Sequence, residues 1–177
     1  MSCMFSGCEA SKIMIDEVKN RKLLDLGKVI DISSIFKGCS NLESIDLKYF
    51  EKIYNVKKMN SLFYNCQNLV NISNIKSLKT KYVTKMDRMF CKCKKLKDLN
   101  DIRFFITEKV ESFLEIFQGC TSLETLPDIG QWNMEKAKDS SGMFKDCVNL
   151  TSLPDISNWN LKKVEKMNKM FSGCNKL

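Results

Sequence analysis

Hydrophobic residues recur along the chain with a fixed period of 27 residues. The clearest marker is a Phe-x-x-Cys motif preceded by Met, Ile or Leu. Its cysteines are spaced by 27 residues, and one further cysteine, Cys8, precedes the first of them by 31. The regularly spaced cysteines are Cys39, Cys66, Cys93, Cys120, Cys147 and Cys174. A fixed period in this range indicates an array in which each repeat is one structural unit.

Each repeat contains two apolar patterns of different spacing. Leu or Ile occurs three and six residues after the cysteine, as at Leu42 and Ile45, within a polar stretch, and this half predicts a short strand. The other half, as in Val56–Phe63, has the i, i+3, i+6, i+7 spacing of one helical or 3₁₀ face. The sequence therefore predicts one short parallel strand and one short helical or 3₁₀ turn per 27-residue coil.

A single repeat is too small to fold alone. About eight buried apolar side chains contribute roughly 1.5 to 3 kcal/mol each, whereas ordering the backbone costs roughly 1 to 2 kcal/mol for each of about 27 residues. Neighbouring coils must therefore bury one another's faces. We expect one α/β domain over residues 1–177, a right-handed solenoid of about six coils. All seven motif phenylalanines should be buried in it.

The repeats are not identical. Residues 35–177 carry the regular period, whereas residues 1–34 predict an irregular N-terminal coil or an imperfect cap. From the third repeat on, the strand half holds one inserted residue, which predicts a β-bulge. Pro127 and Pro154 lie within this insertion, where a missing N–H is best tolerated.

The last two repeats carry the fullest motif. Leu123–Cys147 and Leu150–Cys174 read Leu-x-x-Leu-Pro-Asp-Ile-x-x-Trp-Asn, followed by Met-Phe-x-x-Cys. They resemble BspA-type leucine-rich repeats, in their short-motif branch of surface-protein repeats, whose units continue Val-x-x-Met-x-x-Met-Phe-x-x-Cys. Ala137 and Ser140 replace the Val and the first Met of this pattern, and Phe113 replaces the same Met one repeat earlier. The resemblance covers residues 35–177 well. It implies a leucine-rich-repeat-like solenoid with a parallel strand ladder, no catalysis, and a role in protein binding or surface adhesion.

Composition removes most catalytic chemistry. The chain has 177 residues and no histidine, which excludes Ser-His-Asp, Cys-His and HExxH sites. No nucleophile–base pair, phosphate loop or carboxylate pocket emerges either, so we predict no enzyme and no cofactor. There is no apolar run long enough for a spanning helix, and Met1–Ala10 does not read as a signal peptide. Only the resemblance to BspA-type repeats therefore bears on where in or outside the cell the protein acts, and it implies the cell surface or secretion.

Nine cysteines could form disulfides or hold a metal. Equivalent cysteines of stacked coils point the same way rather than at one another, which disfavours disulfides. Alternation sends Cys91 and Cys93 to opposite sides, which disfavours zinc. We therefore predict buried, reduced ladder thiols and no metal. Cys3 and Cys91 lie off the ladder and should react first.

Charge raises two further possibilities. The net charge is +8, and the cluster Lys92–Lys97 could attract nucleic acid. The aromatic residues fall on predicted core positions, however, so we interpret the lysines as a solvated surface and predict no nucleic-acid partner. A row of Asn74, Asp101, Asp128 and Asp155 could bind Ca²⁺, but Asx side chains beside strands more often bond local backbone N–H groups.

The predicted binding site is the exposed row of the strand face. If Leu42 and Ile45 point inward, their neighbours point outward. The row comprises Glu43, Ser44, Asp46, Asn71, Ser73, Lys97, Asp98, Asn100, Glu124, Thr125, Thr151 and Ser152. It is net acidic on a basic chain, which suits a basic or hydroxyl-rich protein partner. The alternative is a structural spacer or coat segment that binds no specific ligand. The chain begins inside a motif at Met4 and ends just after Cys174, so we expect a fragment of a longer array or end-to-end self-association.

Overall fold

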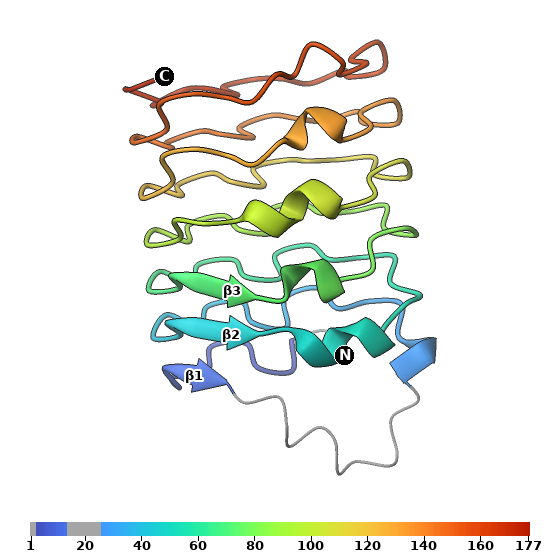
Figure 1. Cartoon of the computed structure of the whole chain (residues 1–177), viewed down its shortest axis with the longest axis vertical. Helices are drawn as coiled ribbons and strands as arrows, with labels where there is room; N and C mark the ends of the chain where they lie inside the picture. The colour runs from blue at the N-terminus through green and yellow to red at the C-terminus, as the bar shows by residue number, and fades with distance from the viewer. Residues whose placement is uncertain (1–2, 14–25) are drawn as a thin grey trace.

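The computed structural model describes residues 3–13 and 26–177, and for Lys12, Ile13 and Asn100 it describes the backbone alone. Within these residues the chain winds through successive turns that stack along one axis, from the N-terminal part to the C-terminal part (Figure 1). Within the predicted irregular segment 1–34, residues 1–2 and 14–25 lie outside the described residues.

A short parallel sheet forms one side of the first coils. Its strands are β1 (Lys12–Ile13), β2 (Ser44–Asp46) and β3 (Asn71–Ser73), in the order β1-β2-β3 (Figure 1). Ser44 lies opposite Asn71, so β2 and β3 pair one 27-residue repeat apart. Ile45 and Ile72 are buried in the core, between the half-buried Ser44 and exposed Asp46 in β2 and between two exposed residues in β3. The predicted parallel strand is confirmed for these coils.

In the described residues beyond β3 the strand half contains no strand and no bulge, so both predictions are wrong there. Short 3₁₀ helices follow the strand half instead. They are η3 (Lys48–Lys52), η4 (Ile75–Ser77), η5 (Asn100–Phe104) and η6 (Ile129–Gln131), while η2 (Leu26–Lys28) precedes β2. The inserted residue Asn74 adopts φ 57° and begins η4. In later coils Pro127 and Pro154 have no N–H to donate to a ladder.

The predicted helical half is not a helix. In each of the seven motifs the residue two before the phenylalanine has φ between 53° and 62°, as at Ser61 and Arg88. The residue two after the phenylalanine has φ between 59° and 81°, as at Asn65 and Gly119. A right-handed helix cannot run through left-handed residues. The 3₁₀ helices η3 to η6 therefore lie after the strand half, and the motif itself is a series of tight turns.

These turns form a backbone ladder between coils. The N–H groups of Ser61, Phe63 and Asn65 donate to carbonyl oxygens 26 residues ahead in the next coil, at 2.8 Å each. The intervening N–H groups close turns within the coil, as Tyr64 does to the Ser61 carbonyl at 3.1 Å. Bonds that span three residues, as in a 3₁₀ helix, explain why the apolar residues have helical spacing. Parallel bridges run on from Asp31 through Lys58 to Lys166, one per repeat.

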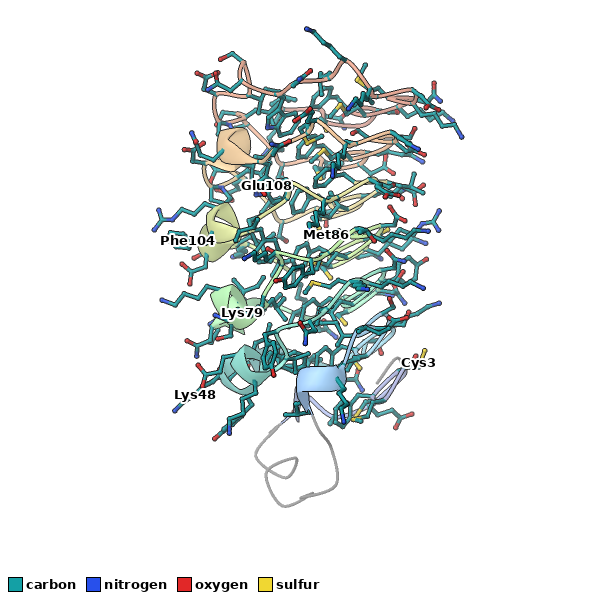
Figure 2. The ribbon with its side chains drawn as sticks, turned by 90° about the vertical axis from the view of Figure 1, so that its right-hand side faces the viewer. Cys3, Lys48, Lys79, Met86, Phe104 and Glu108 are labelled. Atoms are coloured by element: carbon teal, nitrogen blue, oxygen red, sulfur yellow. The ribbon has the colours of Figure 1, made fainter. Side chains whose placement is uncertain are left out.

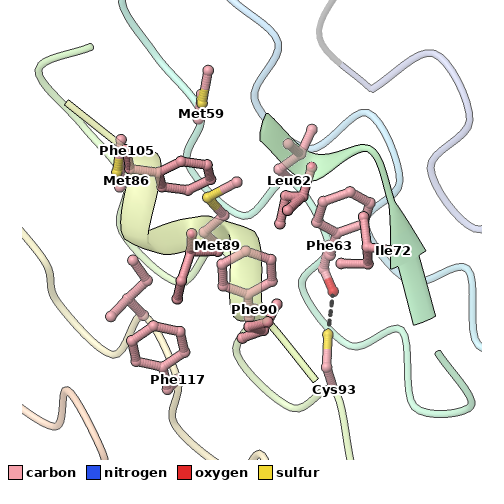
Figure 3. Packing of buried hydrophobic residues seen from close by; sticks show 14 of the residues in the cluster. Met59, Leu62, Phe63, Ile72, Met86, Met89, Phe90, Cys93, Phe105 and Phe117 are labelled. Atoms are coloured by element: carbon pink, nitrogen blue, oxygen red, sulfur yellow. Dashed lines mark hydrogen bonds between the residues drawn. The ribbon is translucent and has the colours of Figure 1, made fainter. Parts of the chain in front are cut away.

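The motif phenylalanines stack through the centre of the molecule. Phe63 and Phe90 have ring centres 5.9 Å apart and Phe90 and Phe117 5.8 Å, with nearly parallel planes (Figure 3). The five inner rings are fully buried. The prediction that all seven are buried is wrong at both ends, because Phe5 is half-buried and Phe171 is 39% exposed. Each terminal ring is covered by a neighbouring coil on one side only.

The ladder cysteines donate hydrogen bonds between coils. The Cys93 thiol donates to the Phe63 carbonyl at 3.0 Å, as the dashed line in Figure 3 shows, and Cys120 donates to the Phe90 carbonyl at 3.2 Å. All nine cysteines are free thiols. Burial raises the pKa of Cys120 well above its ordinary value and that of Cys147 to about 12.

The prediction that Cys91 is exposed and reactive is wrong. Its side chain is 1% exposed, and its thiol donates to Oε1 of Gln118 at 3.6 Å. Burial raises the pKa of Cys91 to about 11. The left-handed residue Lys92 disturbs the alternation between Cys91 and Cys93, so both side chains are buried. Cys3, in contrast, is exposed.

Candidate functional site

The strand face, meaning the row of twelve residues predicted as the binding site, is largely open to solvent. Ser44 is half-buried, and the side chain of Asn100 lies outside the described residues. The remaining members are exposed: Glu43, Asp46, Asn71, Ser73, Lys97, Asp98, Glu124, Thr125, Thr151 and Ser152. Its first half lies on β2 and β3, whose register brings Ser44 beside Asn71 and Asp46 beside Ser73. From Lys97 on, its members lie outside any strand, and Asn100 is the first residue of η5.

Some members of this row form hydrogen bonds within their coil or to a neighbouring coil. Oδ1 of Asp46 accepts hydrogen bonds from the side chain of Asn74 and from the N–H of Lys48, both at 2.8 Å. The bond from Asn74 is the main cause of the lowered pKa of Asp46, with the Lys48 N–H second. Oγ1 of Thr151 donates to the Glu124 carbonyl one repeat earlier, at 3.1 Å.

The predicted role of the Asx row in local turns is confirmed at two positions. Oδ1 of Asp128 accepts from the N–H of Gly130 at 3.1 Å, and Oδ1 of Asp155 accepts from the N–H of Ser157 at 2.9 Å. Across residues 3–13 and 26–177, no three Cys, Asp or Glu side chains gather closely enough to hold a metal ion. No helix in the same residues has the length and apolar character to cross a membrane.

A second surface was missed by the sequence analysis. Tyr54, Tyr82 and Phe104 are 56%, 38% and 57% exposed, although the aromatic residues were predicted to lie in the core. Figure 2 views this side of the molecule and shows Phe104 and Lys79 at the outer edge beside the 3₁₀ helices. Exposed aromatic and basic side chains thus occur together on one face.

Two adjoining hollows open on this face. The first has a volume of about 600 Å³ and is lined by Tyr54, Asn55, Lys76, Leu78, Lys79, Thr80, Lys81, Tyr82, Phe104 and Ile106. The second has a volume of about 550 Å³ and is lined by Gly27, Lys28, Ile30, Asn55, Lys57, Tyr82 and Lys109. They share Asn55 and Tyr82, so we treat them as one surface, the basic groove. None of the described residues in either lining is acidic.

Cations lie over two of the aromatic rings of the groove, those of Tyr82 and Phe104. The ammonium groups of Lys109 and Lys81 lie 4.8 Å and 5.6 Å from the ring centre of Tyr82. The guanidinium group of Arg103 lies 4.8 Å from the ring centre of Phe104. Such contacts hold positive charge against the exposed rings.

The comparisons with known proteins identify the family. The family model described as "Mycoplasma protein of unknown function, DUF285" matches residues 1–100 and 59–177. The chain belongs to the DUF285 family. No curated protein matches this DUF285 chain.

The DUF285 chain is similar to solved bacterial leucine-rich repeat proteins. A leucine-rich cell surface protein from Faecalibacterium prausnitzii is 20% identical over 71% of this chain and 29% of its own, with a TM-score of 0.46. A leucine-rich repeat protein from Eubacterium ventriosum is 17% identical over 81% and 33%, with a TM-score of 0.49. The T. pallidum leucine-rich repeat protein is 20% identical over 84% and 72%, with a TM-score of 0.44. The chain spans a third or less of the first two.

The sequence did contain a signal for the basic groove of this DUF285 chain. One repeat after Tyr54 stands Lys81, and one repeat before Tyr82 stands Asn55. Phe104 has the polar residue Ser77 one repeat earlier. An aromatic residue at a position that is polar in the neighbouring repeat lies outside the core pattern, and this marks it as exposed.

Proposed function

We propose that the chain is a non-catalytic repeat scaffold that binds a protein partner through its strand face. In this proposal the stacked coils form a right-handed, leucine-rich-repeat-like solenoid over residues 1–177, with residues 1–34 as its irregular first part. The observation that carries the proposal is the register of β2 and β3, which places corresponding side chains of these two coils beside one another, one repeat apart in the sequence.

The charge of the row favours a basic or hydroxyl-rich partner. Glu43, Asp46, Asp98 and Glu124 are exposed there against one lysine, Lys97. The chain as a whole has a net charge of +8. A local acidic row on a basic molecule orients an approaching basic partner toward this face. We propose display at the cell surface or secretion as the setting of this role, in keeping with the resemblance to surface-protein repeats.

Charge reversal tests the strand face. Glu43, Asp98 and Glu124 are changed together to Lys, while Asp46 is kept because its carboxylate bonds Asn74 and Lys48. The probe is a labelled Lys- and Ser-rich peptide, followed by fluorescence anisotropy. We expect the parent to bind it and the triple variant to lose binding with an unchanged melting temperature.

A matched control carries charge changes elsewhere. Glu51, Glu108 and Glu111 are exposed and lie outside the row, and changing all three to Lys alters the net charge equally and should leave binding of the basic peptide in place. If the strand-face variant still bound the peptide, or if the parent never bound it, the strand face would not be the binding surface.

The structural-spacer alternative also has an observation in its favour. In the last described coil the N–H groups of Phe171 and Gly173 make no hydrogen bond, whereas those of Phe144 and Asp146, one repeat earlier, donate to the next coil. Met167 is 46% exposed there. This surface can take a further coil, from a second copy or from a continued array. Sedimentation velocity over a range of concentrations tests self-association: Phe171→Lys should abolish it, and a parent that stays monomeric throughout argues against it.

A further inference from the structure

We propose that the basic groove is a docking site for an acidic, extended segment of a partner protein, one that carries apolar side chains among its carboxylates. This binding site is separate from the strand face and does not depend on it. The groove consists of the two adjoining hollows of about 600 and 550 Å³ that share Asn55 and Tyr82.

The described lining of the groove concentrates positive charge. Among residues 3–13 and 26–177, six lysines and no acidic residue line it: Lys28, Lys57, Lys76, Lys79, Lys81 and Lys109. Lys57, Lys76 and Lys79 form no ion pair with any described residue. Their charge is therefore available to an incoming carboxylate, which approaches without breaking an existing pair.

The groove also offers apolar surface of the kind that anchors protein partners. Tyr54 and Phe104 are more than half exposed, and Ile106 is 44% exposed. Large exposed aromatic side chains beside basic ones are typical of interface hot spots. A segment of carboxylates alone would leave this apolar surface uncovered, so the occupant needs apolar side chains as well.

The floor of the groove is held in shape before any partner arrives. Thr80 is 3% exposed, and its Oγ1 accepts the N–H of Ile106 in the next coil at 2.7 Å. Leu78 beside it is 4% exposed and belongs to the core. A site that is already shaped loses little conformational freedom on binding.

Single-stranded nucleic acid also combines negative charge with apolar surface, but the ring contacts disfavour it. Bases bind such surfaces by stacking on open aromatic faces. Here Lys109 and Lys81 lie against the ring of Tyr82, and Arg103 lies against the ring of Phe104. A base would have to displace these cations, whereas a carboxylate can approach them in place.

Fluorescence anisotropy with three labelled probes tests the proposal. The probes are a peptide of alternating acidic residues with interspersed Phe and Leu, the same peptide with Lys in place of each acid, and an oligo-deoxythymidine. The groove variant combines Lys57→Glu, Lys76→Glu and Lys79→Glu. We expect the parent to bind the acidic peptide, and the groove variant to bind it about tenfold more weakly or not at all.

Two variants separate the apolar contribution and the total charge. Phe104→Ala should weaken acidic-peptide binding severalfold, because it removes an exposed ring. The control Lys94→Glu, Lys95→Glu, Lys162→Glu changes the net charge equally at exposed sites outside the groove and should keep most of the binding. Circular dichroism melts confirm that each variant folds.

Several results would overturn the proposal. If the control variant lost as much acidic-peptide binding as the groove variant, the peptide would be attracted by the overall charge of the chain and not by the groove. Tighter binding of the oligonucleotide, lost in the groove variant, would assign the groove to nucleic acid. Self-association of the parent that disappears in the groove variant would assign the groove to a second copy of the chain. If the parent did not bind the acidic peptide, the groove would not be a docking site for an acidic segment. The strand-face triple variant should bind the acidic peptide like the parent, so this test and that of the strand face can fail separately.

Discussion

Phe90 is the most informative position for testing the stacked core. Its side chain is fully buried, and its ring lies between those of Phe63 and Phe117, with centres 5.9 Å and 5.8 Å away. Changing a buried phenylalanine to alanine costs about 3–5 kcal/mol, the sum of lost transfer free energy and the cavity left behind. We expect Phe90→Ala to fall in the upper part of this range, because each of two lost ring contacts contributes about 0.5–1.5 kcal/mol.

Two further phenylalanines serve as matched controls. Phe171 stacks on Phe144 alone and is 39% exposed, so Phe171→Ala should cost about 1–2 kcal/mol. Phe104 is 57% exposed, so Phe104→Ala should change stability by about 0.5 kcal/mol or less. The same chemical change thus has three expected magnitudes, set by how far each ring is buried.

Urea unfolding followed by circular dichroism measures these differences. With a denaturant slope of about 2–3 kcal/mol per molar, Phe90→Ala should lower the unfolding midpoint by about 1–2 M. If Phe90→Ala unfolded at the parent's midpoint, or if Phe171→Ala cost as much as Phe90→Ala, the stacked-core reasoning would be refuted.

Three more predictions follow from single residues. In native alkylation followed by mass spectrometry, the exposed Cys3 should react first, and Cys91 should react slowly at neutral pH because the pKa of its thiol, about 11, keeps that thiol protonated. The reaction of Cys91 should become faster only as the pH approaches this value. Rapid labelling of Cys91 at neutral pH would contradict its burial. Gly130→Ala should strongly lower the melting temperature, since the added Cβ would collide with the carbonyl oxygen of Asp155 in the next coil. A melt like that of the parent would show that the two coils lie further apart. Lys92→Gly should raise stability by about 0.5–1 kcal/mol by relieving a left-handed φ of 62°, and a destabilised variant would mean that the Lys92 side chain contributes more than the strain costs.

The sequence predicted the register of the coils because a fixed period leaves neighbouring strands few ways to pair with their apolar residues buried. Once Ile45 and Ile72 must both be buried, their strands can pair only one repeat apart, and the observed pairing is of this kind. The same reasoning failed for the later coils. There no strand forms although the apolar spacing is kept, and 3₁₀ helices follow the strand half with or without a proline, so apolar spacing alone does not distinguish these outcomes.

The predicted helical half failed for a related reason. Tight turns closed by bonds across three residues repeat their apolar side chains every three to four residues, as a 3₁₀ helix does. What separates the two is the sign of φ, and the sequence signals it only partly, through Gly38, Asn65 and Gly119 two residues after the phenylalanine. The basic groove was missed because Tyr54 and Tyr82 were grouped with the core aromatics, although the neighbouring repeats are polar at both positions.

The coil-to-coil backbone ladder supports every surface described above, and amide hydrogen exchange measured by NMR tests it most directly. The N–H groups of Phe90 and Lys92 donate to the next coil at 3.0 Å and 2.7 Å, whereas those of Phe171 and Gly173, at equivalent positions, make no hydrogen bond. We expect Phe90 and Lys92 to exchange with protection near that of global unfolding, and Phe171 and Gly173 to exchange far faster. Rapid exchange at Phe90 and Lys92, or equal protection at all four amides, would contradict the stacking of coils through this ladder.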